Sequence, residues 1–380
     1  MKITFFSLLF IVFFAFARPV DAIYDSLSRP NNIFGIHILF TYEVPKAAEL
    51  INSSGGDWGY VTIPIQIRDL DLEKWQNFMN EAERNHVIPI VRLATEPLYN
   101  NTSVWRKPTF ADVLDFANFL ASLNWPVKNR YIVVFNEVNR SDEWGGEPPS
   151  PREYAELLNF STEVFKQRNR DFFIISAGLD NASPNDGVKH LDNFVYLSAM
   201  GSFMPQVFER IDGIASHSYP NPGFSQPPSS GPESTSTYKF ELNAIKQFTN
   251  TEKPVFILET GWDSRILGED KVSSYLNQAL ESWKQDPGIV AVTPFLLNSE
   301  NGSFDQFSFL KNGSLTKYAK IYSDFLKTKG EPILVPHPAK QVLAARTFKK
   351  EFKYSTFAPL DLWSNPLLKL YFKTILGLDH

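Results

Sequence analysis

Residues 131–137 read YIVVFNE, an apolar and β-branched run that ends on Asn136 and Glu137. A short run of this composition predicts a buried strand. Seven more such runs occur along the chain, and helical patterns separate them. This alternation is typical of βα units built around a parallel sheet. The predicted strands are residues 33–39, 59–65, 87–93, 131–135, 172–177, 213–217, 255–258 and 289–296.

Three helix starts between these runs carry capping signals. Asp71 precedes apolar residues at helical spacing, and Thr109 precedes a second series of the same kind. Ser150 and Glu153 have the spacing of a capping box, with Pro151 at the first helical position. These signals predict amphipathic helices in the places that a βα repeat requires.

Eight βα units over residues 33–326 match the size of a closed barrel, so we predict a (β/α)8 TIM barrel with a short C-terminal extension. The structural alternative is a doubly wound open sheet. Such a sheet binds its ligand at a glycine-rich turn after the first strand, and residues 35–38 (GIHI) contain no such turn. The strand count therefore favours the barrel.

The first 22 residues predict a signal peptide. An apolar run over residues 3–16 follows Lys2, and small-residue cleavage sites end at Ala17 and Ala22. The run is short for a membrane span, so we expect cleavage and a secreted, extracellular or periplasmic protein. We therefore divide the chain into a signal peptide (1–22), a catalytic barrel (23–330) and a tail (331–380).

Composition excludes several classes of function. The chain has no cysteine, which excludes disulfides, thiolate metal sites and catalytic thiols. The net charge is −5, and residues 331–380 carry seven basic and four acidic side chains. Residues 1–22 carry two basic and one acidic side chain, so residues 23–330 have a net charge of −9. Acidity of this kind argues against a nucleic-acid partner, which requires a basic surface.

The tail from residue 331 begins with prolines and then places apolar residues on one face of a predicted helix over 367–376. We expect this helix to pack against the outside of the barrel. The alternative is a helix on a membrane surface. The oligomeric state cannot be inferred from the sequence.

Catalytic groups of a barrel belong at the carboxyl ends of its strands, because the βα loops build the active face. The fourth predicted strand ends on Glu137, and the seventh ends on Glu259 within LETGW. Hydrolysis of a glycosidic bond needs a proton donor and a second carboxylate, which such a pair supplies. The two geometries, retaining and inverting, differ in the gap between the carboxyl groups.

Together with His217-Ser218-Tyr219 at the end of the sixth strand, these motifs resemble clan A of the retaining glycoside hydrolases, which includes cellulase-like family 5 enzymes. The resemblance covers residues 33–326 and implies hydrolysis of β-glycosidic bonds in an oligo- or polysaccharide, without a cofactor or metal. It implies that Glu137 is the acid/base and Glu259 the nucleophile.

The resemblance also implies substrate-binding residues. Asn136 would donate a hydrogen bond to the sugar 2-hydroxyl, Tyr219 would orient the nucleophile, and His217 would line the sugar site. Arg92, which ends the third strand, could keep Glu259 ionised. The family has a tryptophan after the eighth strand where this chain has Phe295, so we expect Phe295 or Trp262 to provide the stacking platform.

Two other classes of protein use a barrel of this kind. A metal-dependent barrel hydrolase needs a His-x-His on the first strand, and only His37 stands there. A non-catalytic carbohydrate-binding barrel would keep the cleft, but binding alone does not require two opposed glutamates. Hydrolysis of chromogenic β-glycosides separates this second alternative from an enzyme.

Overall fold

The computed structural model describes residues 23–299 and 302–336. All eight predicted barrel strands are present in these ranges. They are β1 (Gly35–His37), β2 (Gly59–Gln66), β3 (Val87–Ala94), β6 (Arg130–Val133), β7 (Phe172–Ile175), β8 (Ile214–His217), β9 (Val255–Glu259) and β10 (Ile289–Val292).

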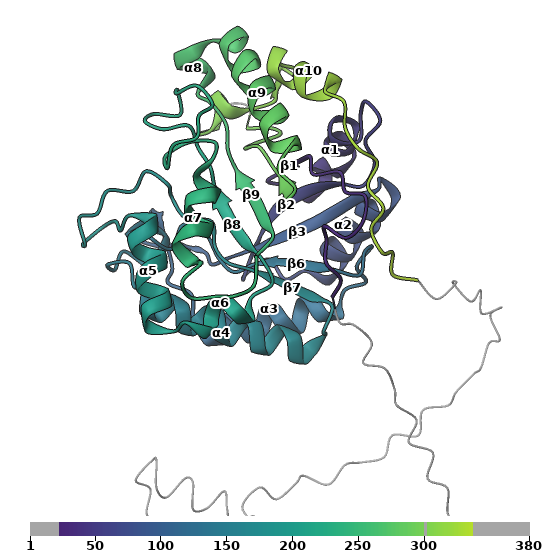
Figure 1. Ribbon diagram of the computed structural model, residues 1–380. Helices are drawn as coiled ribbons and strands as arrows, with labels where there is room; N and C mark the ends of the chain where they lie inside the picture. The colour runs from purple at the N-terminus through teal and green to yellow at the C-terminus, as the bar shows by residue number, and fades with distance from the viewer. Residues whose placement is uncertain (1–22, 300–301, 337–380) are drawn as a thin grey trace, which may run out of the picture. The chain divides into compact units, whose positions relative to one another are not determined.

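The eight strands close into a barrel. Five of them pair in parallel in the order β1-β2-β3-β6-β7, and the other three in the order β10-β9-β8. Parallel bridges from Phe34 to Val292 and from Ile175 to Gly213 join the two groups at both seams. The predicted (β/α)8 TIM barrel is therefore confirmed, and Figure 1 shows its strands in the centre with helices around them.

At least one helix follows each barrel strand. These helices are α1 (Val44–Ile51), α2 (Leu72–Arg84), α3 (Phe110–Ser122), α4 (Pro151–Arg168), α5 (Asn193–Phe203), α6 (Gln206–Arg210), α7 (Thr237–Ile245), α8 (Ser264–Leu267), α9 (Glu269–Lys284) and α10 (Lys317–Asp324). Two small hairpins, β4 (Pro97–Leu98) with β5 (Asn101–Trp105) and β11 (Leu310–Lys311) with β12 (Ser314–Leu315), extend the loops after β3 and β10.

The predicted caps are present. Asp71 caps α2 by accepting a hydrogen bond from a backbone N–H of the first turn, and Thr109 and Asp112 form a complete capping box on α3. Ser150 accepts from the backbone N–H of Glu153 at the start of α4, but the predicted capping box is incomplete, because the Glu153 carboxylate pairs with Lys107. Each such cap contributes about 1 kcal/mol to helix stability.

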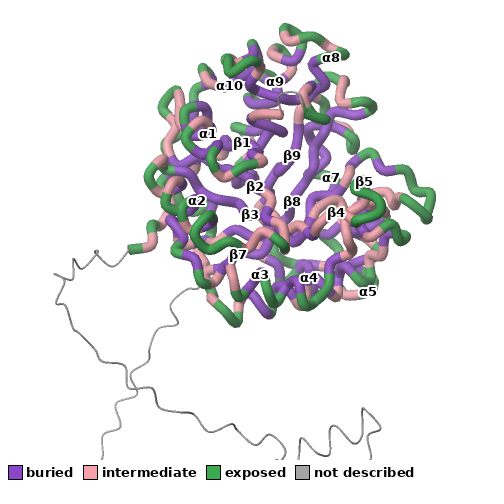
Figure 2. Tube along the Cα trace, turned by 180° about the vertical axis from the view of Figure 1, so that it is seen from behind, coloured by how far each residue is buried: buried purple, intermediate pink, exposed green. Residues whose placement is uncertain are grey.

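The core has two layers, both buried in Figure 2. One layer lies between the strands and the surrounding helices. The other fills the barrel with large side chains, so the barrel is a packed core rather than a channel. This inner layer includes Tyr60, Ile88, Ile90, Tyr131, Val133, Phe173, Ile175, Ala215, Phe256 and Leu258.

Segments from both ends of the described chain cover the amino-terminal end of the strands. Ser26 Oγ lies 2.8 Å from the hydroxyl of Tyr131, and the backbone N–H of Lys128 donates to the carbonyl of Ile333 at 2.8 Å. The packed chain thus continues past residue 330. The predicted signal peptide and tail helix lie outside the described residues, and within the described ones no helix has the length and hydropathy of a membrane span.

Candidate active site

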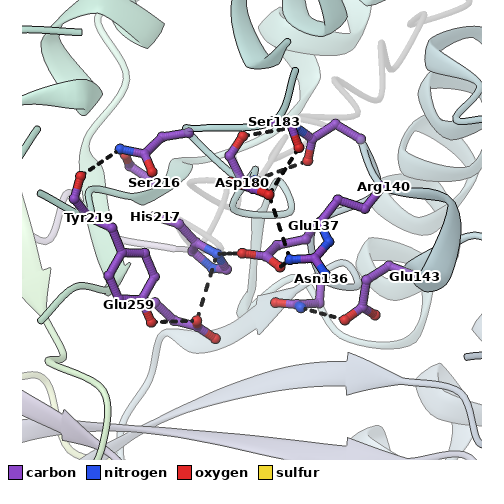
Figure 3. Close-up of polar contacts among 12 residues, drawn as sticks. Asn136, Glu137, Arg140, Glu143, Asp180, Ser183, Ser216, His217, Tyr219 and Glu259 are labelled. Atoms are coloured by element: carbon purple, nitrogen blue, oxygen red, sulfur yellow. Dashed lines mark hydrogen bonds and ion pairs between the residues drawn. The ribbon is translucent and has the colours of Figure 1, made fainter. Parts of the chain in front are cut away.

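Two glutamates face each other at the carboxyl ends of the strands. Glu137 follows β6 and Glu259 ends β9, so both lie at the end of the barrel opposite the covering segments. One carboxylate oxygen of each, together with a ring nitrogen of His217, lies within 4.8 Å of the others (Figure 3). The Glu137 and Glu259 side chains are only 14% and 10% exposed. Desolvation on this scale strengthens every electrostatic contact that they make.

The backbone turns sharply at Glu137. Phe135 has φ of 70° and Glu137 has φ of 35°, a left-handed region that costs a residue other than glycine about 1–3 kcal/mol. A hydrogen bond from the N–H of Glu137 to the carbonyl of Gly178 at 2.9 Å holds this turn. The strained turn places both Asn136 and Glu137 at the mouth of the barrel.

Two donors hold the carboxylate of Glu259. Arg92 Nη1 donates to Oε1 at 2.8 Å, and the Tyr219 hydroxyl donates to Oε2 at 3.0 Å. Burial and the charge of Glu259 raise the pKa of Tyr219 well above its ordinary value, so the phenol stays a donor at neutral pH. These two hydrogen bonds fix the orientation of the carboxylate.

His217 lies between the two glutamates. Its Nδ1 is 2.9 Å from Oε1 of Glu137 and 3.8 Å from Oε2 of Glu259. A β-bulge between Ser216 and His217 shifts the register of β8 against β9, so that His217 pairs with Glu259 rather than with the residue before it. Bulges of this kind redirect side chains next to active sites.

The imidazole of His217 is buried and rests against Gly178, where any Cβ would overlap the ring. Burial lowers the pKa of His217, but the negative charges of Glu259 and Glu137 outweigh it, and the pKa is raised overall. A cationic imidazole is therefore favoured beside the two carboxylates.

Asn136 is held at both ends of its amide. Arg92 Nη1 donates to Oδ1, and Nδ2 donates to Oε1 of Glu143 at 3.1 Å. Burial and the charge of Glu137 raise the pKa of Glu143 to about 7. Glu143, in the short 3₁₀ helix η2 (Ser141–Glu143), was not predicted as a site residue.

The sequence reasoning also missed the groups around the second oxygen of Glu137. Arg140 Nη1 lies 3.2 Å from Oε2 of Glu137 and 3.6 Å from a carboxylate oxygen of Asp180, and Nη2 lies 2.7 Å from Asp142. Burial and the charge of Glu137 raise the pKa of Asp180. Arg140 stands three residues after Glu137 in the sequence, and this spacing was the one signal that could have predicted their contact.

The two predicted platforms differ in their placement. Phe295 lies beside the site, 5.0 Å from the ring of His37, whose Nε2 is 3.8 Å from Oε1 of Glu259. Trp262 is only 3% exposed, and its Nε1 donates to the carbonyl of Gln226. Phe295 is 8% exposed, so both rings are buried, and a sugar platform at either residue stays a prediction.

Glu137, His217 and Glu259 together also form a set of three potential metal ligands. Guanidinium groups already contact both carboxylates, Arg92 on Glu259 and Arg140 on Glu137. Two fixed positive charges disfavour a divalent cation at the same oxygens. Two carboxyl groups and an imidazole at these distances are instead suited to proton transfer.

A family model described as glycosyl hydrolase catalytic core matches residues 102–322, more than half of the chain. The chain belongs to this glycosyl hydrolase family. The matched range contains both glutamates, His217 and Tyr219. No curated protein matches its sequence.

Solved structures share the fold of this glycosyl hydrolase. A family 39 β-xylosidase from Caulobacter crescentus has 12% identity and a TM-score of 0.56, over 78% of this chain and 71% of that one. An endo-β-1,4-glucanase from Xanthomonas axonopodis pv. citri has 13% identity and a TM-score of 0.51, over 77% of this chain and 97% of the glucanase.

A family 39 glycoside hydrolase from Bacteroides cellulosilyticus WH2 has 16% identity and a TM-score of 0.54, over 80% of this chain. This glycosyl hydrolase spans 65% of the length of that protein. All three neighbours are clan A barrel enzymes, as the sequence motifs predicted, and at these identities the likeness concerns the fold.

Proposed function

We propose that this glycosyl hydrolase cleaves β-glycosidic bonds of an oligo- or polysaccharide with retention of the anomeric configuration. The separation of the two carboxylates supports this most directly, because oxygens of Glu137 and Glu259 lie within 4.8 Å of each other. Retaining enzymes have carboxyl groups about 5–5.5 Å apart, whereas inverting enzymes need about 6.5–9.5 Å to admit a water.

Glu259 is the nucleophile in this proposal. Its two oxygens accept hydrogen bonds from Arg92 and Tyr219, which fix the direction of attack. In the first step a carboxylate oxygen of Glu259 bonds to the anomeric carbon and the bond to the leaving oxygen breaks. That leaving oxygen takes the proton of Glu137.

Glu137 then acts as the base of the second step. It removes a proton from water, the water oxygen bonds to the anomeric carbon, and the ester bond to Glu259 breaks. His217 Nδ1 lies 2.9 Å from Oε1 of Glu137 and holds this carboxyl group in place. Glu137 ends the cycle protonated and ready to act again as an acid.

Export remains part of the proposal. Residues 1–22 have the pattern of a signal peptide, and a secreted enzyme meets polysaccharide outside the cell. Amino-terminal sequencing of secreted protein should find Arg18 or Ile23 first. An intact Met1 in a membrane fraction would show an anchor instead.

The mechanism is tested by separating the roles of the two glutamates. Glu259→Ala removes the covalent route and should lower turnover by several orders of magnitude with any leaving group. Glu137→Ala, given an aryl glycoside with an activated leaving group, should form the glycosyl-enzyme but release it slowly. Azide should then restore turnover and give a β-configured glycosyl azide.

Azide added to Glu259→Ala attacks the substrate directly and should give the opposite anomer. Exchange of the two product configurations would show that the roles are reversed. If neither substitution lowers turnover by more than about tenfold, an effect of about 1.4 kcal/mol, the pair is not the catalytic dyad.

A further inference from the structure

The amide of Asn136 has one chemically permitted orientation. A guanidinium carries only donors, so the Asn136 atom facing Arg92 must be the carbonyl oxygen. The amide nitrogen therefore faces Glu143 and donates to its Oε1 at 3.1 Å. Arg92 and Glu143 hold the two ends of this amide as a clamp (Figure 3 shows the Glu143 side).

The clamp leaves one donor for a ligand. An amide nitrogen carries two hydrogens, and the bond to Glu143 uses one of them. The second hydrogen points away from that bond, and the adjacent Glu137 places the amide beside the scissile position. A rotation of the Asn136 side chain would misaim this donor, since hydrogen bonds weaken steeply away from linearity.

We propose that Glu143 is a positioning residue that aims the free N–H of Asn136 at the 2-hydroxyl of the sugar undergoing cleavage. The inference rests on the proposed function and on the role that the resemblance implies for Asn136, a hydrogen bond to that hydroxyl. The same clamp continues through Arg92 to Oε1 of Glu259, so the contact to the 2-hydroxyl and the nucleophile share one donor group.

The clamp persists when Glu143 changes its protonation state. Glu143 lies near Glu137, Arg92 and Asp142, and burial together with the charge of Glu137 raises its pKa to about 7. Both the carboxylate and the carboxylic acid keep an oxygen that accepts from Asn136. Glutamine keeps such an oxygen too, which makes Glu143→Gln the conservative variant.

The test compares an aryl β-glycoside that the wild-type enzyme hydrolyses with its 2-deoxy counterpart. Glu143→Ala should lower kcat/KM on the full substrate by about tenfold to hundredfold, the range that misplacement of a substrate-binding group produces. On the 2-deoxy substrate it should cause less than about a twofold loss. Glu143→Gln should retain most of the wild-type kcat/KM on both.

A double-mutant cycle with Asn136→Ala gives a second readout. In that background Glu143→Ala should cause no further loss, because the group that it positions is absent. Glu147→Ala is the matched control in the same loop: Glu147 is exposed and pairs with Lys107, so kcat/KM should not change. If Glu143→Ala does not fold, Glu143→Asp carries the same test, since the shorter side chain draws the acceptor away from Nδ2.

An equal loss on the full and 2-deoxy substrates, or additive losses in the cycle, would overturn the inference and leave the dyad intact. Full activity of Glu143→Ala would do the same. Failure of the wild-type enzyme to hydrolyse any β-glycoside of a broad panel would instead overturn the proposed function, and the inference with it.

Discussion

Arg92 Nη1 donates to Oε1 of Glu259 at 2.8 Å, between two side chains that are almost completely buried. Removing one partner of a buried pair leaves an uncompensated charge, which costs about 3–5 kcal/mol. Arg92→Met should therefore lower the free energy of unfolding by that amount and reduce kcat by at least about a hundredfold. Chemical denaturation and steady-state kinetics measure the two effects.

Arg68→Met is the control for Arg92→Met, because Arg68 is exposed and pairs with Glu96 outside the dyad. It should change stability by less than about 1 kcal/mol. Wild-type stability in Arg92→Met would mean that Glu259 is protonated or solvated once Arg92 is gone.

Gly178 leaves space for the imidazole of His217. A methyl group at position 178 would overlap that ring. A methyl group at position 288 would lie 3.4 Å from its nearest neighbour, a carboxylate oxygen of Asp286, which is an ordinary contact distance. Gly178→Ala should displace His217 and reduce kcat by about tenfold or more, and Gly288→Ala should leave kcat unchanged. Equal kcat in both variants would show that His217 tolerates the shift or is not needed.

The barrel could be predicted because its signals are local. Each strand is a short apolar run, and caps such as Asp71 and Thr109 mark helix starts within a few residues. The placement of Glu137 and Glu259 at one end of the barrel could be predicted for the same reason, since a carboxylate that ends an apolar strand needs no knowledge of distant contacts. Arg92 was expected from its place at a strand end and Tyr219 from the resemblance to clan A, and both contact Glu259.

The missed residues depend on geometry that no local pattern encodes. Glu143 belongs to a 3₁₀ turn and reaches the site only because the chain bends sharply at Glu137. Asp180 comes from the long loop after β7. Trp262, three residues after Glu259, also makes a contact that its local sequence does not encode, because its indole nitrogen donates to Gln226 in the loop after β8.

Two exposed rings lie on the loop after β1, at the active end of the barrel. Phe40 and Tyr42 are 52% and 73% exposed and stack on each other with ring centroids 5.3 Å apart. Glu43 fixes the loop by accepting from the backbone N–H groups of Leu39 and Phe40. A loop held in this way, with aromatic faces exposed at the active end of the barrel, is suited to stacking on the sugars of a polysaccharide that extend beyond the two glutamates.

The double variant Phe40→Ala/Tyr42→Ala should therefore raise KM for a polysaccharide by about tenfold, the equivalent of about 1.4 kcal/mol. KM for a short aryl glycoside should stay the same, because such a substrate does not extend to the loop. Phe240→Ala, at an exposed ring on α7, is the control. An equal rise in KM for both substrates would mean that the loop affects the two glutamates rather than the binding of the polysaccharide.

Glu241 on α7 gives the enzyme a pH-dependent stability that does not require catalysis. Its side chain is buried, Oε1 accepts from Asn193 at 3.1 Å, and Oε2 has no hydrogen-bond partner among the described residues. Burial raises the pKa of Glu241 from 4.5 to about 7, against the opposing effects of Ser216, Asn193 and the charge of His217. Between these two pH values the folded state binds more protons than the unfolded state, so stability falls as pH rises from about 4.5 to about 7 and stays low above it.

Glu241→Gln removes this titration, since the amide is neutral at every pH. The variant should match the wild type near pH 4.5 and exceed it at pH 8 by up to about 3 kcal/mol, the equivalent of the pKa difference at about 1.4 kcal/mol for each unit. Burial also raises the pKa of Glu143 to about 7, but Glu143 is present in both proteins, so it does not contribute to the difference between wild type and variant. Urea unfolding at pH 4.5, 6 and 8 measures it, with Glu281→Gln on the exposed face of α9 as the control. If the difference in free energy of unfolding between wild type and Glu241→Gln does not change with pH, Glu241 ionises in the folded protein as easily as in water and the prediction is wrong.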